Sequence, residues 1–319
     1  MDGVSQPESK SLDPKKFQDP DVTAAGETRA QVSLDGLKTL WINTGTLCNL
    51  TCANCYIESS PRNDRLSYIT IDEVRSYLDE IRDESLETEE IGFTGGEPFM
   101  NLDMIQMLEV ALLRGFRALV LTNAMKPMRH HEAALKKLKY WFNDKLVVRV
   151  SVDHYTQQRH EEERGPGSWQ PMLDGLIWLS QNKFNFDIAG RTPWGEEEMA
   201  MREGYAELFA EHDISMDADD SSRLVLFPEM DEKQDVPEIT DQCWSILDVD
   251  PGTMMCATSR MVVKRKGAEK PAVIACTLLP YDDQFELGTT LAESSDDIPL
   301  NHPHCAKFCV LGGGACSQS

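Results

Sequence analysis

The feature that most restricts the fold of this chain is an alternation of short apolar segments with helical patterns, recurring roughly every 30 residues from Leu37 onward. Strand-like segments occupy residues 37–45, 90–96, 117–123, 145–153, 184–190 and 222–228, and helical patterns occupy 70–86, 101–116, 130–142, 168–183 and 196–212. Such repeats connect parallel strands through right-handed crossovers. The sequence therefore predicts an α/β fold with a parallel sheet. The pattern leaves open whether that sheet is flat and doubly wound or curled into a full or partial barrel.

Helix-end signals support this interpretation. Thr70 is expected to be an N-cap, with Glu73 three residues later completing a capping box. Gly115 is expected to end the second helix. Trp169 and Trp178, nine residues apart on one predicted helix, are expected to belong to the core.

Distinctive polar residues and glycines follow the predicted strands. They are a three-cysteine loop, the segment Gly95–Pro98, the pair Thr122–Asn123, the residues Ser151 and Asp153, and the pair Gly190–Arg191. The carboxyl ends of parallel strands share one edge of a sheet, and that edge carries the functional loops of such folds. We therefore expect all of these residues on one rim.

The three-cysteine loop, "TLCNLTCANCY", places Cys48, Cys52 and Cys55 within eight positions, and the next cysteine is Cys243. Thiolates are soft ligands suited to zinc or to iron–sulfur clusters. A closed zinc site usually has four ligands. Three local thiols instead fit a four-iron cubane whose fourth iron is left open for a small chelating molecule.

Composition narrows the range of possible functions. The formal net charge of −23 argues against a nucleic-acid partner. No apolar run is long enough to cross a membrane, and the N-terminus has no signal-peptide pattern. We expect a cytoplasmic protein, with residues 1–36 disordered or loosely attached and an acidic, solvated connector over 213–250.

The motif Cys48-x-x-x-Cys52-x-x-Cys55 followed by Tyr56, with Gly95-Gly96-Glu97-Pro98 about 40 residues later, resembles the radical S-adenosylmethionine (radical SAM) superfamily. The resemblance covers roughly residues 37–227. It implies a partial (β/α)6 TIM-like barrel over residues 37–230. It also implies a 4Fe-4S cluster that reductively cleaves S-adenosylmethionine (SAM) to a 5′-deoxyadenosyl radical, which abstracts hydrogen from a substrate.

The same resemblance implies roles for individual residues. Cys48, Cys52 and Cys55 would bind the cluster, and Gly95, Gly96, Glu97 and Pro98 would meet the methionine amino group of SAM. Ser151 and Asp153 match the position that often binds the ribose, Arg191 would pair with the carboxylate, and Asn123 would be a polar contact at the rim. The family often has an aromatic residue before the third cysteine, where this chain has Asn54, and Tyr56 is the candidate to replace it at the adenine. Ordinary capping or ion pairing is an equal alternative for Ser151, Asp153 and Arg191.

Residues 231–319 contain a second group of cysteines around a predicted hairpin at 260–279, with Cys256 before it and Cys276 in its second strand. The layout resembles the SPASM or twitch extension, which carries auxiliary iron–sulfur clusters. We expect one auxiliary 4Fe-4S cluster, with Cys243 outside it. Cys256, Cys276, Cys305 and Cys309 are the favoured ligands and Cys316 is the main competitor; zinc bound by thiolates with His302 or His304 is the alternative.

The leading hypothesis is a radical SAM enzyme acting on a peptide, a protein side chain or a small metabolite, with an electron donor such as flavodoxin or ferredoxin. No catalytic acid, base or radical donor is identified from the sequence. The alternatives are a zinc-binding interaction scaffold and a radical methyltransferase that uses SAM. The N-terminal segment is too short and polar for a peptide-recognition domain, so a peptide would be recognised by the barrel face or by a separate protein.

Overall fold

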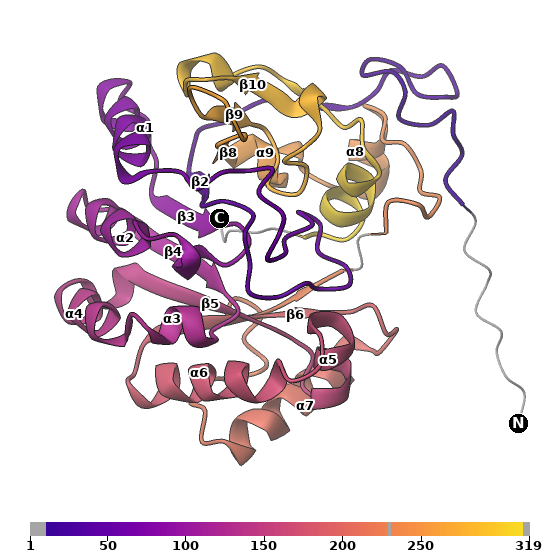
Figure 1. Ribbon diagram of the computed structural model, residues 1–319. Helices are drawn as coiled ribbons and strands as arrows, with labels where there is room; N and C mark the ends of the chain where they lie inside the picture. Colours follow the sequence, from indigo (N-terminus) through magenta and orange to yellow (C-terminus); the bar gives the residue numbers. More distant parts are fainter. Residues whose placement is uncertain (1–10, 229–230, 315–319) are drawn as a thin grey trace, which may run out of the picture.

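A computed structural model describes residues 11–228 and 231–314 of the chain. Its centre is a nine-stranded sheet in the order β10-β9-β8-β2-β3-β4-β5-β6-β7 (Figure 1). Six consecutive parallel strands form most of it: β2 (Thr39–Asn43), β3 (Glu90–Thr94), β4 (Arg117–Thr122), β5 (Leu146–Asp153), β6 (Asn185–Arg191) and β7 (Leu224–Phe227). Each strand lies beside the one before it, so every crossover steps in the same direction and the strand order never reverses as it does in a doubly wound sheet. The predicted partial barrel is confirmed, and it is not closed.

The predicted helices are also present. They are α1 (Ile71–Asp83), α2 (Met104–Leu113), α4 (Glu132–Phe142), α6 (Trp169–Gln181) and α7 (Glu198–Glu211). Thr70 and Glu73 make the predicted capping box. Four further helices of the described residues were not predicted: α3 (Lys126–Arg129), α5 (Gln157–Arg164), α8 (Cys243–Leu247) and α9 (Met255–Thr258). Helix α5 has the sequence QQRHEEER, which contains no apolar residue and so has no apolar periodicity to detect.

The main core lies between these helices and the sheet. Leu78 of α1, Met107 and Leu108 of α2, and Leu176 of α6 pack there with apolar side chains of the strands. Trp169 and Trp178 are buried, as predicted. Burial of the apolar faces of these helices against the sheet stabilises the arrangement. The carboxyl ends of the strands form a rim at one edge of the sheet.

The C-terminal hairpin continues the main sheet. Strand β8 (Ser259–Val263) pairs antiparallel with β9 (Ala272–Ile274), which confirms the hairpin, and β10 (Glu286–Gly288) adds to β9. Strand β8 also pairs in parallel with β2, with Thr39 opposite Ser259. The sheet therefore runs without a break across the predicted division at residue 230. Cys276 lies two residues after β9 and not inside it as predicted.

Residues 11–36 contradict the prediction of a disordered or loosely attached segment. Strand β1 (Gln31–Val32) pairs with β11 (Ile298–Pro299), and Ala30 and Val32 are buried. Arg29 is also buried and forms a 2.6 Å ion pair with Glu238 of the acidic connector. The prediction was wrong because these partners are more than 200 residues away, so no local pattern reveals them. Residues 1–10 lie outside the described ranges.

Within the described ranges, no helix has the length and apolar character needed to cross a membrane.

Candidate active site

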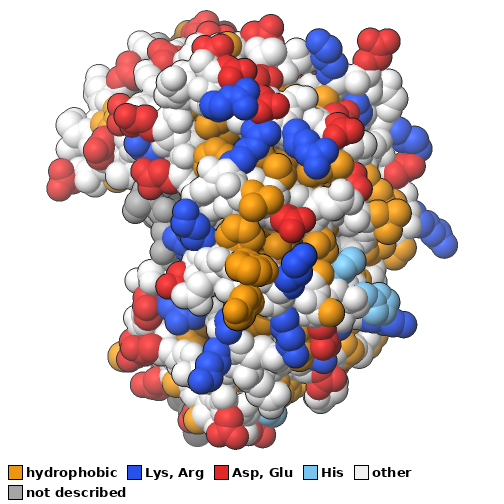
Figure 2. Space-filling model, turned by 90° about the vertical axis from the view of Figure 1, so that its left-hand side faces the viewer, with side chains coloured by type: hydrophobic (Ala, Val, Ile, Leu, Met, Phe, Trp, Pro, Cys, Tyr) orange, Lys and Arg blue, Asp and Glu red, His pale blue; other side chains and the backbone are white. Residues whose placement is uncertain are grey.

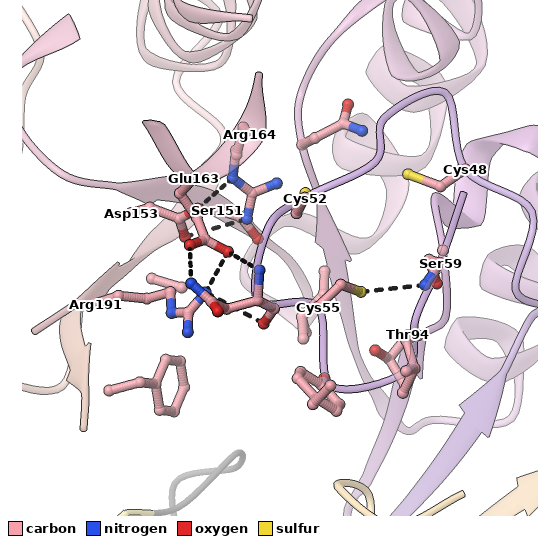
Figure 3. A pocket seen from close by; sticks show the side chains of 18 of the residues that line it. Cys48, Cys52, Cys55, Ser59, Thr94, Ser151, Asp153, Glu163, Arg164 and Arg191 are labelled. Carbon is pink, nitrogen blue, oxygen red and sulfur yellow. Dashed lines mark hydrogen bonds and ion pairs between the residues drawn. The ribbon is translucent and has the colours of Figure 1, made fainter. Parts of the chain in front are cut away.

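A pocket at the carboxyl ends of the parallel strands brings most of the predicted site residues together (Figure 3). Its empty space, counted to the solvent-facing mouth, is ≈ 1070 Å³, which matches the scale of small-molecule sites. Ten predicted residues line it: Cys48, Cys52, Cys55, Tyr56, Gly95, Gly96, Asn123, Ser151, Asp153 and Arg191. The expectation of a shared rim is therefore met by residues from β2, β3, β4, β5 and β6 or the loops that follow them.

The cysteine loop between β2 and α1 forms one wall of the pocket. The amide of Cys48 donates to the carbonyl of Ser60. Backbone amides also donate to two of the sulfur atoms: Leu50 N to Cys48 Sγ at 3.4 Å and Ser59 N to Cys55 Sγ at 3.3 Å. Amide hydrogen bonds to sulfur favour thiolates and tune the iron–sulfur clusters they hold.

The thiols of this loop are not poised to act as free nucleophiles. Burial raises the pKa of Cys48 to about 12 and that of Cys52 to about 11. At neutral pH both side chains are therefore uncharged unless a cation stabilises the thiolate. A bound metal supplies that charge, so the chemistry of these donors fits metal binding better than covalent catalysis.

The two glycines after β3 allow the chain to dock against the start of the cysteine loop. Gly95 has φ +141°, and a Cβ there would lie 2.5 Å from the carbonyl oxygen of Gly45; a Cβ on Gly96 would lie 2.3 Å from that of Leu47. Gly96 N donates to Gly45 O at 2.8 Å. The close approach predicted for a ligand is thus also a close approach between two backbone segments, which holds the cysteine loop in place.

Glu97 and Pro98 do not line the pocket. The Glu97 carboxylate is buried behind the wall, where it accepts hydrogen bonds from the amides of Phe99 and Asn123 and from the Thr122 hydroxyl. Burial raises the pKa of Glu97 to about 7. Pro98 begins a short 3-10 helix, Pro98–Met100, and is buried. Glu97 therefore links the loop after β3 to the loop after β4, on the side of the wall that faces away from the pocket.

Two residues that sequence reasoning missed, Glu163 and Arg164, end helix α5 and line the pocket. Arg164 makes two hydrogen bonds to Asp153, from Nε at 2.6 Å and from an Nη at 3.2 Å. Glu163 binds Arg191 and Asn54. The available signal was their position shortly after Ser151 and Asp153, but helix α5 itself went undetected.

Three of the predicted SAM contacts, Asp153, Arg191 and Asn123, have protein partners. Asp153 is held by Arg164, and its φ of +61° marks a tight backbone turn at the end of β5. Arg191 is paired with Glu163, and Asn123 Nδ2 donates to Asn49 Oδ1 at 2.9 Å. The contacts of Asp153 and Arg191 are ion pairs of the kind that the sequence left open for them.

Part of the pocket lining is apolar. It consists of Leu121, Ala189, Phe227, Leu278 and Phe308. Phe227 and Phe308 stack with ring centroids 5.8 Å apart. Phe308 lies between Cys305 and Cys309 in a π-helix, Cys305–Val310, so the C-terminal cysteine region contributes directly to this wall.

Cys305 lies near two of the other favoured C-terminal cysteines, Cys256 and Cys276. Burial raises the pKa of Cys305, and the nearby thiolates of Cys276 and Cys256 raise it further. Cys309 is four residues along the π-helix from Cys305. Cys243 contacts Thr240 instead, and Cys316 lies outside the described residues. His302 and His304 are close to each other, and burial lowers the pKa of both to about 4, so both imidazoles are neutral at pH 7.

Among residues 11–228 and 231–314, no three histidine, cysteine or acidic side chains converge closely enough to hold a single metal ion. A zinc ion needs all of its thiolates about 2.3 Å from one point. A cubane binds each thiolate through a different iron, so its ligands stand further apart. Cys48, Cys52 and Cys55, arranged around one open pocket, fit the second requirement (Figure 3).

Comparison with known proteins identifies the family. The sequence profile of the radical SAM superfamily matches residues 42–200, which include both the cysteine motif and Gly95–Pro98. The chain belongs to the radical SAM superfamily. Members of this superfamily are enzymes that bind SAM and a 4Fe-4S cluster, and the residues lining the pocket fit both groups.

Two curated radical SAM relatives match over part of their length. The antilisterial bacteriocin subtilosin biosynthesis protein AlbA of Bacillus subtilis is 28% identical over 160 residues, 49% of this chain and 34% of its own. The AdoMet-dependent heme synthase of Oleidesulfovibrio alaskensis is 26% identical over 149 residues, 44% of this chain and 34% of its own. The match thus spans about a third of each relative.

Solved structures share the fold at low identity. Streptococcus suis SuiB bound to the precursor peptide SuiA superposes with a TM-score of 0.59 at 12% identity, over 83% of this chain and 66% of SuiB. The anSMEcpe protein with bound AdoMet gives 0.56 at 16% identity, over 81% of this chain and 77% of that one. Both alignments extend beyond residues 42–200, so the similarity of fold includes part of the chain outside the family match.

Proposed function

We propose that this chain is a radical SAM enzyme that binds a 4Fe-4S cluster through Cys48, Cys52 and Cys55 and SAM in the adjoining pocket. The observation that carries the proposal is the single pocket lined by these three thiols, the Gly95–Gly96 backbone and the polar ends of β5 and β6. When bound, the cluster and SAM supply a one-electron cleavage of the sulfonium that gives methionine and a 5′-deoxyadenosyl radical.

The chain's own residues bind and orient the cofactor in this proposal. The Ser151 hydroxyl and the Asp153 carboxylate offer hydrogen bonds to ribose hydroxyls. Arg191 and Arg164 offer positive charge to the methionine carboxylate. The exposed backbone at Gly95–Gly96 lies where the amino group would approach, while Glu97 acts from behind the wall. Tyr56 and Asn123 complete the lining.

We further propose that Cys256, Cys276, Cys305 and Cys309 hold one auxiliary 4Fe-4S cluster, with Cys316 as the competing ligand. The electrostatic coupling of Cys305 to Cys276 and Cys256 supports this group. Because Phe308 lies between two of these cysteines and also lines the pocket, the auxiliary cluster would sit beside the substrate chamber.

The proposed substrate is a peptide side chain. AlbA is by its name a bacteriocin biosynthesis protein, and the SuiB structure holds a precursor peptide. The apolar wall of Phe227, Leu278 and Phe308 is suited to an uncharged side chain. A low-potential carrier such as flavodoxin or ferredoxin would supply the electron, in the cytoplasm.

Anaerobic reconstitution tests the core of this proposal. The wild-type protein is expected to take up iron and sulfide, to bleach with dithionite and to release 5′-deoxyadenosine from SAM. Replacing Cys48, Cys52 and Cys55 by alanine should remove about four irons per chain and all 5′-deoxyadenosine. Cys243→Ala is the matched control and should change neither. A colourless zinc protein, or a brown one that never cleaves SAM, would overturn the proposal.

A further inference from the structure

The last turn of α5 contains a buried carboxylate, Glu163, whose hydrogen bonds reach two other parts of the site. The residue is 4% exposed, although its neighbours Glu161 and Glu162 are more exposed. Arg164, the next residue, ties the end of α5 to Asp153 of β5. Glu163 therefore projects from a fixed point toward the cysteine loop (Figure 3).

One set of Glu163 contacts holds the segment between the second and third cysteines. Asn54 N donates to Glu163 Oε1 at 2.9 Å, and Asn54 Nδ2 donates to Oε2 at 2.8 Å. In addition, Ala53 N donates to the backbone carbonyl of Glu163 at 2.7 Å. Ala53 and Asn54 are the only residues between Cys52 and Cys55, so the whole of this short span is fixed to α5.

The other contact reaches the end of β6. Arg191 donates to Glu163 Oε1 at 2.5 Å and also to the carbonyl of Asn54 at 3.4 Å. The contacts among Glu163, Asn54 and Arg191 thus link α5, the cysteine loop and β6 to one another.

We propose that Glu163 is a positioning residue for the cluster: it holds Cys52 and Cys55 at the spacing that the cluster needs and fixes Arg191 beside them. The inference rests on the proposed function and adds a role that the cysteine motif does not contain. It also accounts for Asn54, which occupies the position before the third cysteine where the radical SAM superfamily often has an aromatic residue. An amide there matches the buried carboxylate of Glu163.

The chemistry of the contact requires a carboxylate. Three donors, Asn54 N, Asn54 Nδ2 and Arg191, converge on its two oxygens. Glutamine has nearly the same shape, but it carries no charge to pair with Arg191, and in the observed arrangement its NH2 group would face a donor, Asn54 Nδ2 or the pair of Asn54 N and Arg191. Glu163→Gln is therefore a nearly isosteric change that should loosen the loop.

The experiment uses the reconstituted protein with SAM and follows iron loss to a chelator. The SAM-dependent change in the electron paramagnetic resonance spectrum of the reduced cluster reports on the Cys48–Cys55 site specifically. Glu163→Gln should lose that signal at least about 10-fold faster than wild type, the range seen when groups supporting metal ligands are removed. The matched control is Glu162→Gln, the adjacent residue, which is exposed and paired with Arg159, and it should match wild type.

A second variant, Asn54→Ala, removes the Asn54 Nδ2–Glu163 Oε2 hydrogen bond from the loop side and leaves α5 and the two backbone hydrogen bonds of the span unchanged. It should also accelerate loss of the signal, and it carries the test if Glu163→Gln does not fold. Wild-type rates of signal loss in both variants would overturn the positioning role. Absence of a SAM-dependent signal in wild type is a different result, because it would contradict the proposed function itself.

Discussion

At the scale of single residues, the side of the pocket wall on which a carboxylate lies decides which acidic groups of the rim can face a ligand. Asp153 and Glu163 line the pocket and are neutralised by arginines. Glu97 lies behind the wall with only neutral donors around its carboxylate. From its place in the sequence, Glu97 was grouped with the ligand-facing residues. The sequence pattern shows that a residue lies at the rim, but it does not show whether the side chain points into the pocket or away from it.

The pKa of Glu97 predicts a pH dependence of stability. Burial raises this pKa from 4.5 to about 7, so between these values the native state keeps a proton that the unfolded chain has released. The free energy of unfolding should therefore fall as pH rises through this interval, by on the order of 3 kcal/mol. Urea unfolding of the protein without metal, from pH 5 to pH 8, measures it.

Glu97→Gln provides the comparison. The amide lowers stability by a constant amount because it faces backbone donors, but it should remove most of the fall between pH 5 and pH 7. Parallel curves for the variant and wild type would show that Glu97 is not the titrating group.

At the scale of elements, a helix could be predicted from the sequence where it has apolar periodicity and recognisable signals at its ends. Helix α1 has both, with Val74, Leu78 and Ile81 on its buried face and a capping box at its start, and the sequence predicted it. Helix α5 has neither, yet it carries Glu163 and Arg164 into the site. A polar helix held by ion pairs to other segments leaves no trace in local pattern.

The capping box of α1 predicts a measurable loss. The Thr70 hydroxyl accepts from the amide of Glu73, and the Glu73 side chain accepts from the amide of Thr70. Thr70→Ala should lower the free energy of unfolding by about 1 kcal/mol, because it leaves a helix-end amide without its partner. Chemical denaturation measures the change. Thr70→Ser keeps the hydroxyl and should stay close to wild type; an equal loss in both variants would assign the effect to the methyl group.

At the scale of the whole molecule, contacts across long sequence separations unite the chain. The parallel strands and the rim were predictable because each strand and the helix that follows it are close together in the sequence. The pairing of β8 with β2 and the packing of residues 11–36 were not, because their partners lie more than 200 residues away. Cys48, Cys52 and Cys55 fall in the first class, whereas the proximity of Cys305 to Cys256 and Cys276 required tertiary structure.

The Arg29–Glu238 pair predicts that the N-terminal segment is integral to stability. Both side chains are almost fully buried, so removing Arg29 leaves the Glu238 carboxylate with two backbone amide donors and no cation. Arg29→Met should lower the free energy of unfolding by about 3–5 kcal/mol and expose residues 11–36 to limited proteolysis. Lys38→Met, which breaks an exposed pair with Glu87, should leave the free energy of unfolding close to that of the wild type. Equal effects of the two substitutions would contradict the assigned role of the buried pair.

The continuity of the sheet through β8 has a practical consequence for expression of shorter fragments. A fragment trimmed to residues 37–230 would strip β2 of one neighbour and leave a bare hydrogen-bonding edge on an otherwise intact barrel wall. Such edges recruit other chains, so that fragment should precipitate or self-associate where the longer polypeptide does not. Attempts to isolate residues 37–230 by themselves would then fail for a reason unrelated to their chemistry.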